Sequence, residues 1–306
     1  MLSRMYDDLP IHIDDVPAEG WDIGELTATR RRLGRHVGAR RLGIAIMEIA
    51  PGRRSTPPHI HADQDEAFLV LAGSGLSWQS HSSRDVRAYE IRVDDVILHR
   101  AGAEAHTLIA GEEGLTVLIV AEGSRSGITY LPRTKSFWLG PRWSPADGKH
   151  PFAADVDAGP LDVPAPSAER PPTLRNLAEL PLNEGRQGRL AYATRDMRAM
   201  GPAEIVLAQD EMPPDTHNTE LHFHSAREEA WFVRGGGGIA RLGEDGHELR
   251  PGSFWLAHEN TGVGHRVEVG SGGMQLVTMG DLIPGDVCAY TEQRTFSPAR
   301  GVVLPY

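Results

Sequence analysis

The sequence predicts an all-β protein made of two similar β-barrels in tandem, and three observations support this prediction. Short apolar runs bounded by turn residues recur along the chain, a pattern typical of antiparallel sandwiches and barrels. The 34 glycines and 22 prolines favour short strands and frequent turns over long helices. A motif of two histidines and a glutamate also occurs twice, with the same internal spacing. We therefore expect one barrel in each half of the chain.

The length of the chain favours two domains as well. Its 306 residues exceed the roughly 100 to 200 residues of a typical domain, and each half is long enough to bury its own core. The two copies of the motif begin 163 residues apart, at His59 and His222. The units of a solenoid are much shorter, roughly 20 to 50 residues. The repeat therefore predicts two domains and not a solenoid.

The expected strands occur at matching places in the two halves. They are the apolar runs near residues 43–51, 67–73, 95–99 and 115–123, and near residues 203–209, 230–238, 253–259 and 274–281. Between the halves, residues 132–172 are rich in proline, including Pro141 and Pro145, and show little alternation of apolar and polar residues. This composition predicts a connector that ranges from ordered to flexible along its length. We therefore expect a first barrel with a leading arm in residues 1–131, the connector in 132–172 and a second barrel in 173–306.

The repeated motif can place its side chains inside a barrel. In a β-strand, residues two apart project to the same face, so His59 and His61 can point together into the interior. Glu66 follows five residues later, which is the wrong parity for one uninterrupted strand. A turn must therefore intervene, and Glu66 begins a new strand whose inward side also carries Phe68 and Val70. The second copy has the same spacing.

A further histidine lies downstream of each copy, so each half offers three imidazole nitrogens and one carboxylate oxygen. The candidate metal ligands are His59, His61, Glu66 and His106 in the first half and His222, His224, Glu229 and His265 in the second. This donor set suits a divalent transition metal in each barrel, namely Fe(II), Mn(II), Ni(II), Cu(II), Co(II) or Zn(II), whereas Mg²⁺ and Ca²⁺ prefer oxygen ligands. One or two coordination positions remain for water, dioxygen or substrate, which makes the metal catalytic in principle.

These motifs resemble those of the cupin superfamily, whose first motif has the form G-x5-6-H-x-H-x3-4-E-x6-G and whose second ends in P-x-G-x2-H. The first copy matches the first motif from Gly52 to Gly73, and the second copy matches it except for the leading glycine. The second motif departs more, because neither half has its proline and one extra residue separates Gly102 from His106. Glu104 is therefore an alternative ligand to His106.

The resemblance spans nearly the whole chain as a bicupin and implies a jelly-roll β-barrel in each half with the metal inside. Residues 250–252 and 280–287 are similar to those of cupin proteins without an assigned reaction. Cupins with full ligand sets include dioxygenases of aromatic compounds, oxalate-degrading enzymes and sugar isomerases, and other cupins only bind ligands. The fold alone does not select among these functions.

Three functions follow from the donor set and the resemblance. The first hypothesis is a metal-dependent oxidoreductase, a dioxygenase of a small organic or aromatic compound, with Fe(II) as the favoured ion. The alternative is an isomerase, lyase or decarboxylase in which the metal acts as a Lewis acid without redox chemistry. The third is a cupin that binds a small molecule and catalyses nothing. Turnover without dioxygen would separate the first two.

Charge and composition restrict the partners of the protein. With 31 basic and 42 acidic residues, the formal charge of −11 discourages binding to nucleic acid or to an anionic membrane. We find neither a secretory signal nor the run of ~20 apolar residues that a membrane helix needs. Cys288 is the only cysteine, so no intrachain disulfide can form, and its expected role is that of a small buried hydrophobe. We expect a cytoplasmic protein with a small-molecule substrate, and exposed edge strands favour a homodimer.

A cluster of arginines precedes the first barrel in this otherwise acidic protein. It consists of Arg30, Arg31, Arg32, Arg35, Arg40 and Arg41. Charge runs of this kind usually belong to a solvated strand pair or to a subunit contact. We favour that interpretation over an anion-binding role.

Overall fold

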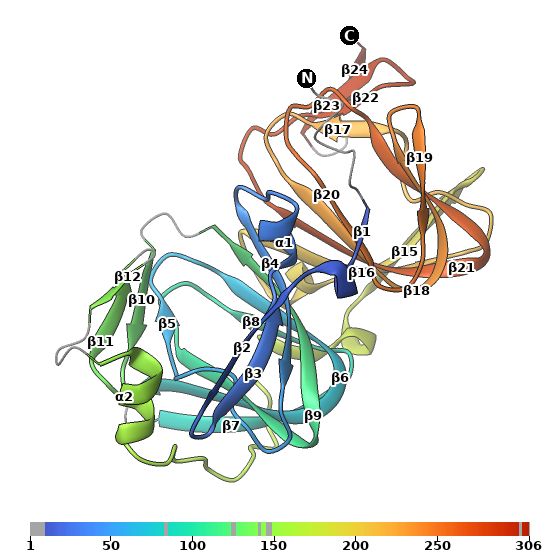
Figure 1. Ribbon diagram of the computed structural model, residues 1–306. Helices are drawn as coiled ribbons and strands as arrows, with labels where there is room; N and C mark the ends of the chain where they lie inside the picture. Colours follow the sequence, from blue (N-terminus) through green and yellow to red (C-terminus); the bar gives the residue numbers. More distant parts are fainter. Residues whose placement is uncertain are drawn as a thin grey trace. The chain divides into compact units, whose positions relative to one another are not determined.

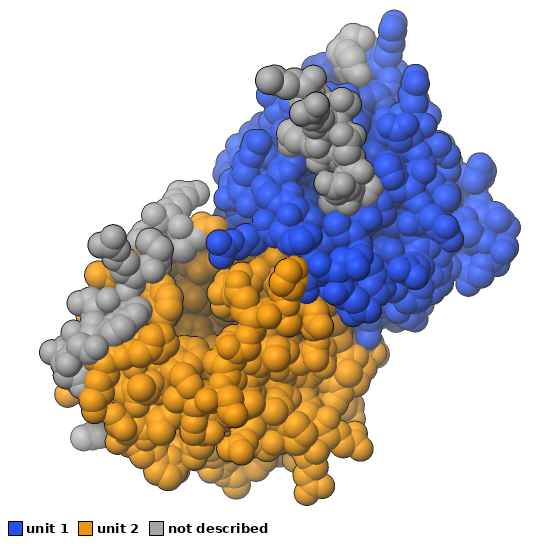
Figure 2. Space-filling view, viewed as in Figure 1, with its two compact units in different colours: residues 1–16, 33–42, 180–306 blue, residues 17–32, 43–179 orange. Residues whose placement is uncertain are grey.

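The computed structural model describes residues 10–82, 85–123, 127–139, 142–144, 149–299 and 302–305. These residues form mainly antiparallel β-strands, so the prediction of an all-β protein is confirmed (Figure 1). They divide into two compact units (Figure 2). The unit that we call N-terminal comprises Pro17–Arg32 and Gly43–Glu179, and the unit that we call C-terminal comprises Met1–Val16, Leu33–Leu42 and Leu180–Tyr306.

The N-terminal unit is built from two antiparallel sheets. One runs in the order β13-β8-β6-β9-β4-β3-β2, with β7 paired to β6, and the other in the order β12-β11-β10-β5. The strands are β2 (Ala18–Ile23), β3 (Leu26–Arg31), β4 (Leu42–Ile49), β5 (Ile60–His61), β6 (Glu66–Ser82), β7 (Asp85–Arg92), β8 (Asp95–His99), β9 (Ala105–Glu122), β10 (Ile128–Leu131), β11 (Ser136–Leu139), β12 (Arg142–Ser144) and β13 (Leu174–Asn176). The helices are α2 (Pro151–Asp157) and the 3₁₀ helix η3 (Leu177–Glu179).

The C-terminal unit has a similar order of strands, but they are joined in a single sheet. Its sheet runs in the order β1-β20-β18-β21-β17-β22-β23-β24, with β16 paired to β21, β15 to β16, β14 to β15 and β19 to β18. The strands are β1 (Ile11–His12), β14 (Leu182–Gln187), β15 (Leu190–Asp196), β16 (Ile205–Met212), β17 (His222–His224), β18 (Glu229–Leu242), β19 (Asp245–Leu249), β20 (Ser253–Ala257), β21 (His265–Asp281), β22 (Cys288–Tyr290), β23 (Thr295–Ala299) and β24 (Val302–Pro305). The helices are α1 (Leu33–His36), η2 (Ile13–Asp15) and η4 (Met197–Met200).

Alternation along the strands fills each barrel interior. Phe68 and Val70 follow the first glutamate on β6 and belong to the core of the N-terminal unit, as their parity predicts. Trp231 and Val233 do the same on β18 of the C-terminal unit. Each large apolar side chain buried in this way contributes about 1.5–3 kcal/mol to the free energy of unfolding. The same inward faces carry the candidate metal ligands.

The N-terminal arm belongs to the C-terminal unit, which differs from the predicted boundaries. β1 pairs with β20, with Ile11 opposite Phe254. The segment 33–42 is held by the carboxylate of Glu228, which accepts hydrogen bonds from the backbone N–H groups of Arg40 (3.0 Å) and Arg41 (2.9 Å). These contacts join residues more than 180 positions apart, so no local sequence pattern predicts them. The first nine residues of the arm lie outside the described residues.

The predicted connector largely belongs to the N-terminal unit. Its helix α2 carries Asp155, which is fully buried and accepts ion-paired hydrogen bonds from Arg54 at 2.8 Å and from Arg133 at 2.9 Å. The buried carboxylate of Asp155 fixes this segment, because it neutralises two guanidinium groups. Moving Asp155 into solvent would leave the charges of Arg54 and Arg133 without their partner. Pro141 and Pro145 lie outside the described residues. Among the described helices, none has the length and hydropathy of a membrane span.

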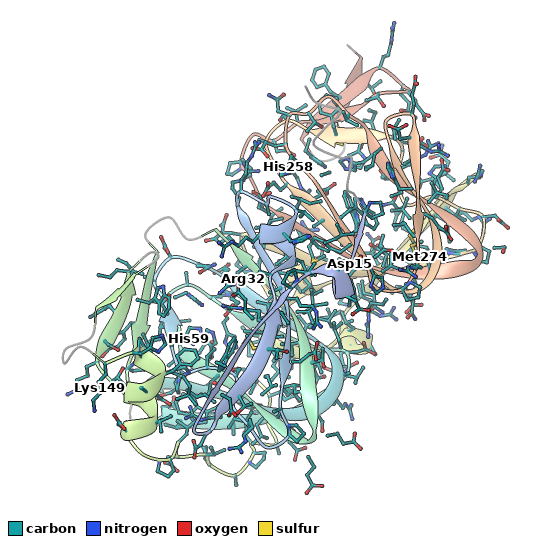
Figure 3. The ribbon with its side chains drawn as sticks, viewed as in Figure 1. Asp15, Arg32, His59, Lys149, His258 and Met274 are labelled. Carbon is teal, nitrogen blue, oxygen red and sulfur yellow. The ribbon has the colours of Figure 1, made fainter. Side chains whose placement is uncertain are left out.

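Replacing Glu228 by alanine should destabilise the C-terminal unit. The Glu228 side chain is fully buried and also accepts a hydrogen bond from Nδ1 of His258 at 3.1 Å (His258 is labelled in Figure 3). Its removal leaves several buried donors without partners, so we expect a loss of about 3–5 kcal/mol in the free energy of unfolding. Urea denaturation measures this loss. Glu248→Ala, at an exposed position of β19, is the control and should change the free energy by less than about 0.5 kcal/mol.

Candidate metal centres

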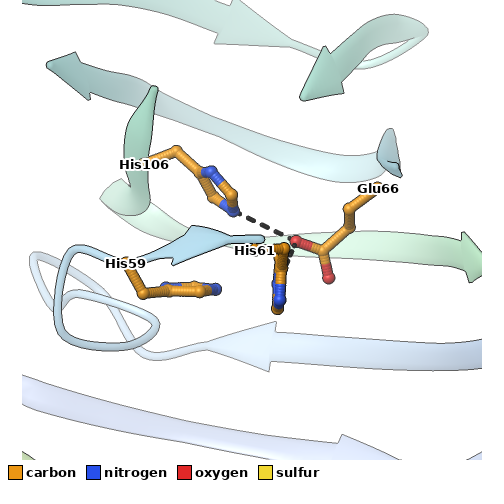
Figure 4. Close-up of side chains that lie close together, drawn as sticks. All are labelled: His59, His61, Glu66 and His106. Atoms are coloured by element: carbon orange, nitrogen blue, oxygen red, sulfur yellow. Dashed lines mark hydrogen bonds and ion pairs between the residues drawn. The ribbon is translucent and has the colours of Figure 1, made fainter. Parts of the chain in front are cut away.

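The N-terminal unit gathers the four side chains of the first motif around one point (Figure 4). His59 forms a β-bridge with His106 of β9, while His61 ends β5 and Glu66 begins β6. Oε2 of Glu66 lies 3.1 Å from Nε2 of His106 and 3.4 Å from Nε2 of His61. The ligand atoms of all four residues lie within 4.8 Å of one another. A single metal ion fits between donors at these separations.

Hydrogen bonds behind the imidazoles fix which nitrogen points inward. Nδ1 of His59 donates to the carbonyl oxygen of Pro57 at 3.0 Å, and Nδ1 of His61 is bonded to Oγ1 of Thr129 at 3.1 Å. The carbonyl acceptor places the proton of neutral His59 on Nδ1, so its Nε2 atom has a lone pair available, and Nε2 of His61 lies 3.4 Å from Oε2 of Glu66. Partners of this kind orient metal-bound histidines and set their tautomer.

Most of the protonation states of this centre suit metal binding. Burial, together with the neighbouring His106 and His61, holds the pKa of His59 well below its ordinary value, and burial and His99 lower the pKa of His106 to about 4. Burial alone would raise the pKa of Glu66, but hydrogen bonds from His106 and His61 hold it well below its ordinary value. Burial disfavours the protonated form of His61, but the hydrogen bond to Glu66 outweighs it and raises the pKa of His61. Neutral imidazoles and an ionised carboxylate are the forms that bind a metal ion, so His59, His106 and Glu66 are already suited to it, whereas His61 must give up its proton when it is charged.

His99 lies behind His106, a feature that the sequence analysis missed. The two rings are stacked with centroids 3.9 Å apart and planes 8° apart. Nδ1 of His99 donates to Glu104 at 2.6 Å. Glu104, the alternative to His106, therefore does not join the centre, because its carboxylate is engaged by His99. The structure brings His106 into the centre instead, despite its extra residue of spacing.

The C-terminal unit brings the second set of ligands together less tightly, because the ligand atoms of His222, Glu229 and His265 lie within 4.8 Å of one another while His224 is grouped only with His222 and Cys288. Oε2 of Glu229 lies 3.2 Å from Nε2 of His265 and 3.4 Å from Nε2 of both His222 and His224. Nδ1 of His222 donates to the carbonyl oxygen of Glu220 at 2.9 Å, which repeats the bond made by His59. The two centres therefore share the inner donors and one of the outer hydrogen bonds.

The surroundings of the C-terminal centre differ in three ways. Nδ1 of His224 donates to the carboxylate of Asp286 at 2.6 Å, where the N-terminal centre has a hydroxyl group. Arg227 forms an ion pair with Oε1 of Glu229 at 2.6 Å. Cys288 is paired with His224 across β17 and β22, and its sulfur lies within 4.8 Å of the ligand nitrogens of His222 and His224. The expectation that Cys288 is only a buried hydrophobe therefore misses its place beside the centre.

These differences change the charge at the C-terminal centre. Burial disfavours the protonated form of His224, but Glu229 and Asp286 outweigh it and raise its pKa to about 9. Burial raises the pKa of the Cys288 thiol to about 12. No feature of the local sequence ties Asp286 or Cys288 to the motif, because β22 follows β17 by more than 60 residues.

A third group of potential ligands serves a different purpose. Glu228, His258 and Glu259 lie close together. Glu228 and His258 are hydrogen bonded to each other, and Glu259 forms an ion pair with Arg40 at 3.2 Å. The group holds the segment 33–42 in place, so we do not count it as a metal centre.

The comparisons with known proteins agree with this fold. Residues 45–121 match the model of the cupin domain. An oxalate decarboxylase from Lactobacillus farciminis in complex with formate superposes with a TM-score of 0.59 and 16% identity, covering 91% of this chain and 87% of that one. Bacillus subtilis oxalate decarboxylase, in a structure from work on its Mn(II) centres, gives 0.59 and 16% over 90% and 78% of the two chains. Tomato vicilin gives 0.58 and 12% over 93% and 88%.

No curated protein sequence matches the chain. At identities this low, the structural neighbours establish the fold and leave the activity open. The cupin-domain match identifies residues 45–121 as a cupin domain, and the structural neighbours show that the chain as a whole has their two-barrel fold. The predicted jelly-roll architecture is thereby confirmed.

Removing the histidine pair from one unit should remove one metal ion per chain. We expect His222→Ala with His224→Ala to halve the bound metal, and His59→Ala with His61→Ala to do the same, because each unit has its own donors. Inductively coupled plasma mass spectrometry of the purified variants measures the stoichiometry. The exposed His36→Ala is the control and should retain the full amount. Unchanged metal content in both double variants would rule out these residues as ligands.

Metal binding to the C-terminal centre should release a proton. Without a bound ion, the pKa of His224 is raised to about 9, so the ring is protonated at pH 7 and must lose its proton to bind the metal. The affinity of this centre should therefore rise by about tenfold per pH unit up to about pH 9. Calorimetric titration of Mn(II) in buffers of different ionisation enthalpy counts the protons.

Asp286→Asn is the matched variant for this experiment. It removes the carboxylate that orients His224, so the affinity should fall by about 10–100-fold and less than one proton should be released. Thr129→Ala, which affects only the N-terminal centre, should leave the C-terminal titration unchanged. A titration with no buffer dependence would contradict this account.

Proposed function

We propose that this two-barrel protein is a metal-dependent enzyme that cleaves a carbon–carbon bond in a small carboxylate, as a decarboxylase or a related lyase. The observation that carries the proposal is the cluster of His59, His61, Glu66 and His106, together with the approach of His222, His224 and His265 to Glu229, in a fold shared with oxalate decarboxylases. Of the functions that the sequence left open, this non-redox alternative therefore has more support than a dioxygenase. No comparison favours iron or an oxidoreductase.

We further propose a divalent ion in each centre, with Mn(II) as the leading candidate. The donor set of three imidazoles and one carboxylate suits several divalent ions, and the structural neighbour from Bacillus subtilis has Mn(II) centres. When bound, such an ion supplies Lewis acidity that polarises a carboxylate or carbonyl oxygen of the substrate. His59, His61, Glu66 and His106 would hold it in the N-terminal unit.

The residues around the centres support this chemistry. In the N-terminal unit, His61 and Glu66 retain side-chain exposures of 17% and 13%, so a small molecule can approach them. Phe68 lies against the ring of His106, with centroids 6.1 Å apart, and provides an apolar wall that limits water. An apolar surrounding favours loss of carbon dioxide, because the charge of the carboxylate is less well solvated there than in water.

In the C-terminal unit, β22 places a proton donor near the ligands. Tyr290 is paired with His222 across β17 and β22, with ring centroids 6.0 Å apart. Burial and the neighbouring Cys288 raise the pKa of its hydroxyl group to about 12, so the hydroxyl keeps its proton at neutral pH. Decarboxylation leaves an electron pair on the remaining carbon atom, and this carbon must take up a proton. A neutral phenol beside the centre can donate one.

The proposal predicts release of carbon dioxide without net consumption of dioxygen. Mn(II)-loaded protein should be incubated with oxalate and other small mono- and dicarboxylates while carbon dioxide and dioxygen are monitored together. We expect carbon dioxide from at least one of these acids with no stoichiometric loss of dioxygen. Consumption of one dioxygen per substrate would instead identify a dioxygenase. Binding without turnover under every metal would identify a non-catalytic binding protein.

A further inference from the structure

One arginine of the basic cluster has a different environment from its neighbours. Arg31 forms an ion pair with Glu48 at 2.6 Å, and Arg32 forms one with Glu19 at 2.8 Å. The Nε atoms of Arg30 and Arg31 are both buried without a partner, but the side chain of Arg30 makes no hydrogen bond or ion pair within the part of the chain that the structure describes. The expectation of a solvated strand pair therefore fits Arg31 and Arg32 but not Arg30.

Strand parity directs Arg30 into the N-terminal barrel. On β3 it shares a face with Ala28, and it lies opposite Met47 of β4. Both of these residues belong to the core cluster of the barrel, as does Phe68, whose ring contacts His106. Arg31 projects from the opposite face of the strand. Arg30 is thus on the inward face of its strand, the face that carries the core of the N-terminal barrel.

The guanidinium group is held on an aromatic ring and not by a carboxylate. Its central carbon lies 5.6 Å from the ring centre of Trp21. Trp21 is itself fixed, because its Nε1 donates to the carbonyl oxygen of Ser55 at 2.8 Å. A cation–π contact of this kind positions the group and leaves its N–H donors unused.

The charge of Arg30 persists at neutral pH despite its surroundings. Burial and the neighbouring Arg32 lower its pKa to about 10, while Glu19 and Glu66 act in the opposite direction. A half-buried cation without a hydrogen-bonded partner is costly, and an anion brought into the barrel would remove that cost.

The C-terminal barrel has no cation at the matching place. There β15 lies beside β16, and Thr194 stands opposite Asp210 as Arg30 stands opposite Met47. Asp210 is buried, and it accepts hydrogen bonds from Thr194 and from Thr278. The inner wall therefore carries a guanidinium group in the N-terminal barrel and a carboxyl group in the C-terminal barrel.

We propose that Arg30 binds the carboxylate group of a small substrate in the N-terminal barrel, a role for which the C-terminal barrel has no residue at the matching place. The substrate class rests on the function proposed above. A guanidinium fork matches a carboxylate with two parallel hydrogen bonds, which a lysine at the same place cannot supply. The bound acid would extend from Arg30 towards the metal ligands.

Calorimetric binding of oxalate to the Mn(II)-loaded protein tests this role. Arg30→Gln should weaken binding by about 10–100-fold, since a hydrogen bond to a charged group is worth about 1.5–3 kcal/mol. Arg30→Lys keeps the charge but not the fork, so it should give an intermediate loss. Arg31→Gln, the matched control on the outer face, should bind oxalate as the native protein does.

A stability measurement separates binding from a structural role. Without oxalate, Arg30→Gln should leave the free energy of unfolding unchanged or higher, because it removes a half-buried charge that lacks a partner. A marked loss of stability would identify a structural arginine and overturn the proposal. Oxalate binding equal to that of the native protein in Arg30→Gln would also overturn it, as would Arg30-dependent binding of inorganic phosphate with no binding of oxalate. Arg30-dependent oxalate binding without release of carbon dioxide would support this role while refuting the proposed reaction.

Discussion

The structure of each barrel depends on one ionised glutamate that is buried among three imidazoles. In the N-terminal unit, a single oxygen of Glu66 lies within hydrogen-bond distance of His106 and close to His61. A carboxylate in such a place is tolerated only if positive charge or hydrogen-bond donors compensate for its lost hydration. A divalent cation does this more fully than protonated imidazoles can. The C-terminal unit has the same requirement. There Arg227 compensates part of the negative charge through an ion pair with Oε1 of Glu229.

Much of this could be predicted from the sequence because the relevant pattern is local. Two histidines two residues apart share a strand face, and the parity of Glu66 requires the turn that the structure contains between β5 and β6. The expected all-β fold with paired barrels follows from the same alternation. Whether the eight candidate residues bind metal remains a prediction; the structure gathers the four of the N-terminal unit around one point and brings the three histidines of the C-terminal unit to within 3.4 Å of Glu229.

Other features could not be predicted, because they depend on contacts between distant parts of the chain. Cys288 comes from β22 and Asp286 from the turn before it, and the stack of His99 on His106 requires the register between β6, β8 and β9. The domain boundaries differ for the same reason. Glu228 binds backbone groups of the segment 33–42, and Asp155 draws the predicted connector onto the N-terminal unit. Composition revealed the prolines of the connector but not the buried ion pairs that hold it.

The two centres have the same types of inner donor but different surrounding residues, so they are not equivalent. The account as a whole requires that histidine nitrogens bind a metal ion in both units. Manganese K-edge X-ray absorption spectroscopy of the fully loaded protein tests this most directly. We predict two ions per chain, a shell of nitrogen and oxygen ligands at roughly 2.0–2.2 Å and the outer-shell scattering of about three imidazoles per ion. A shell of oxygen ligands without imidazole scattering would contradict it.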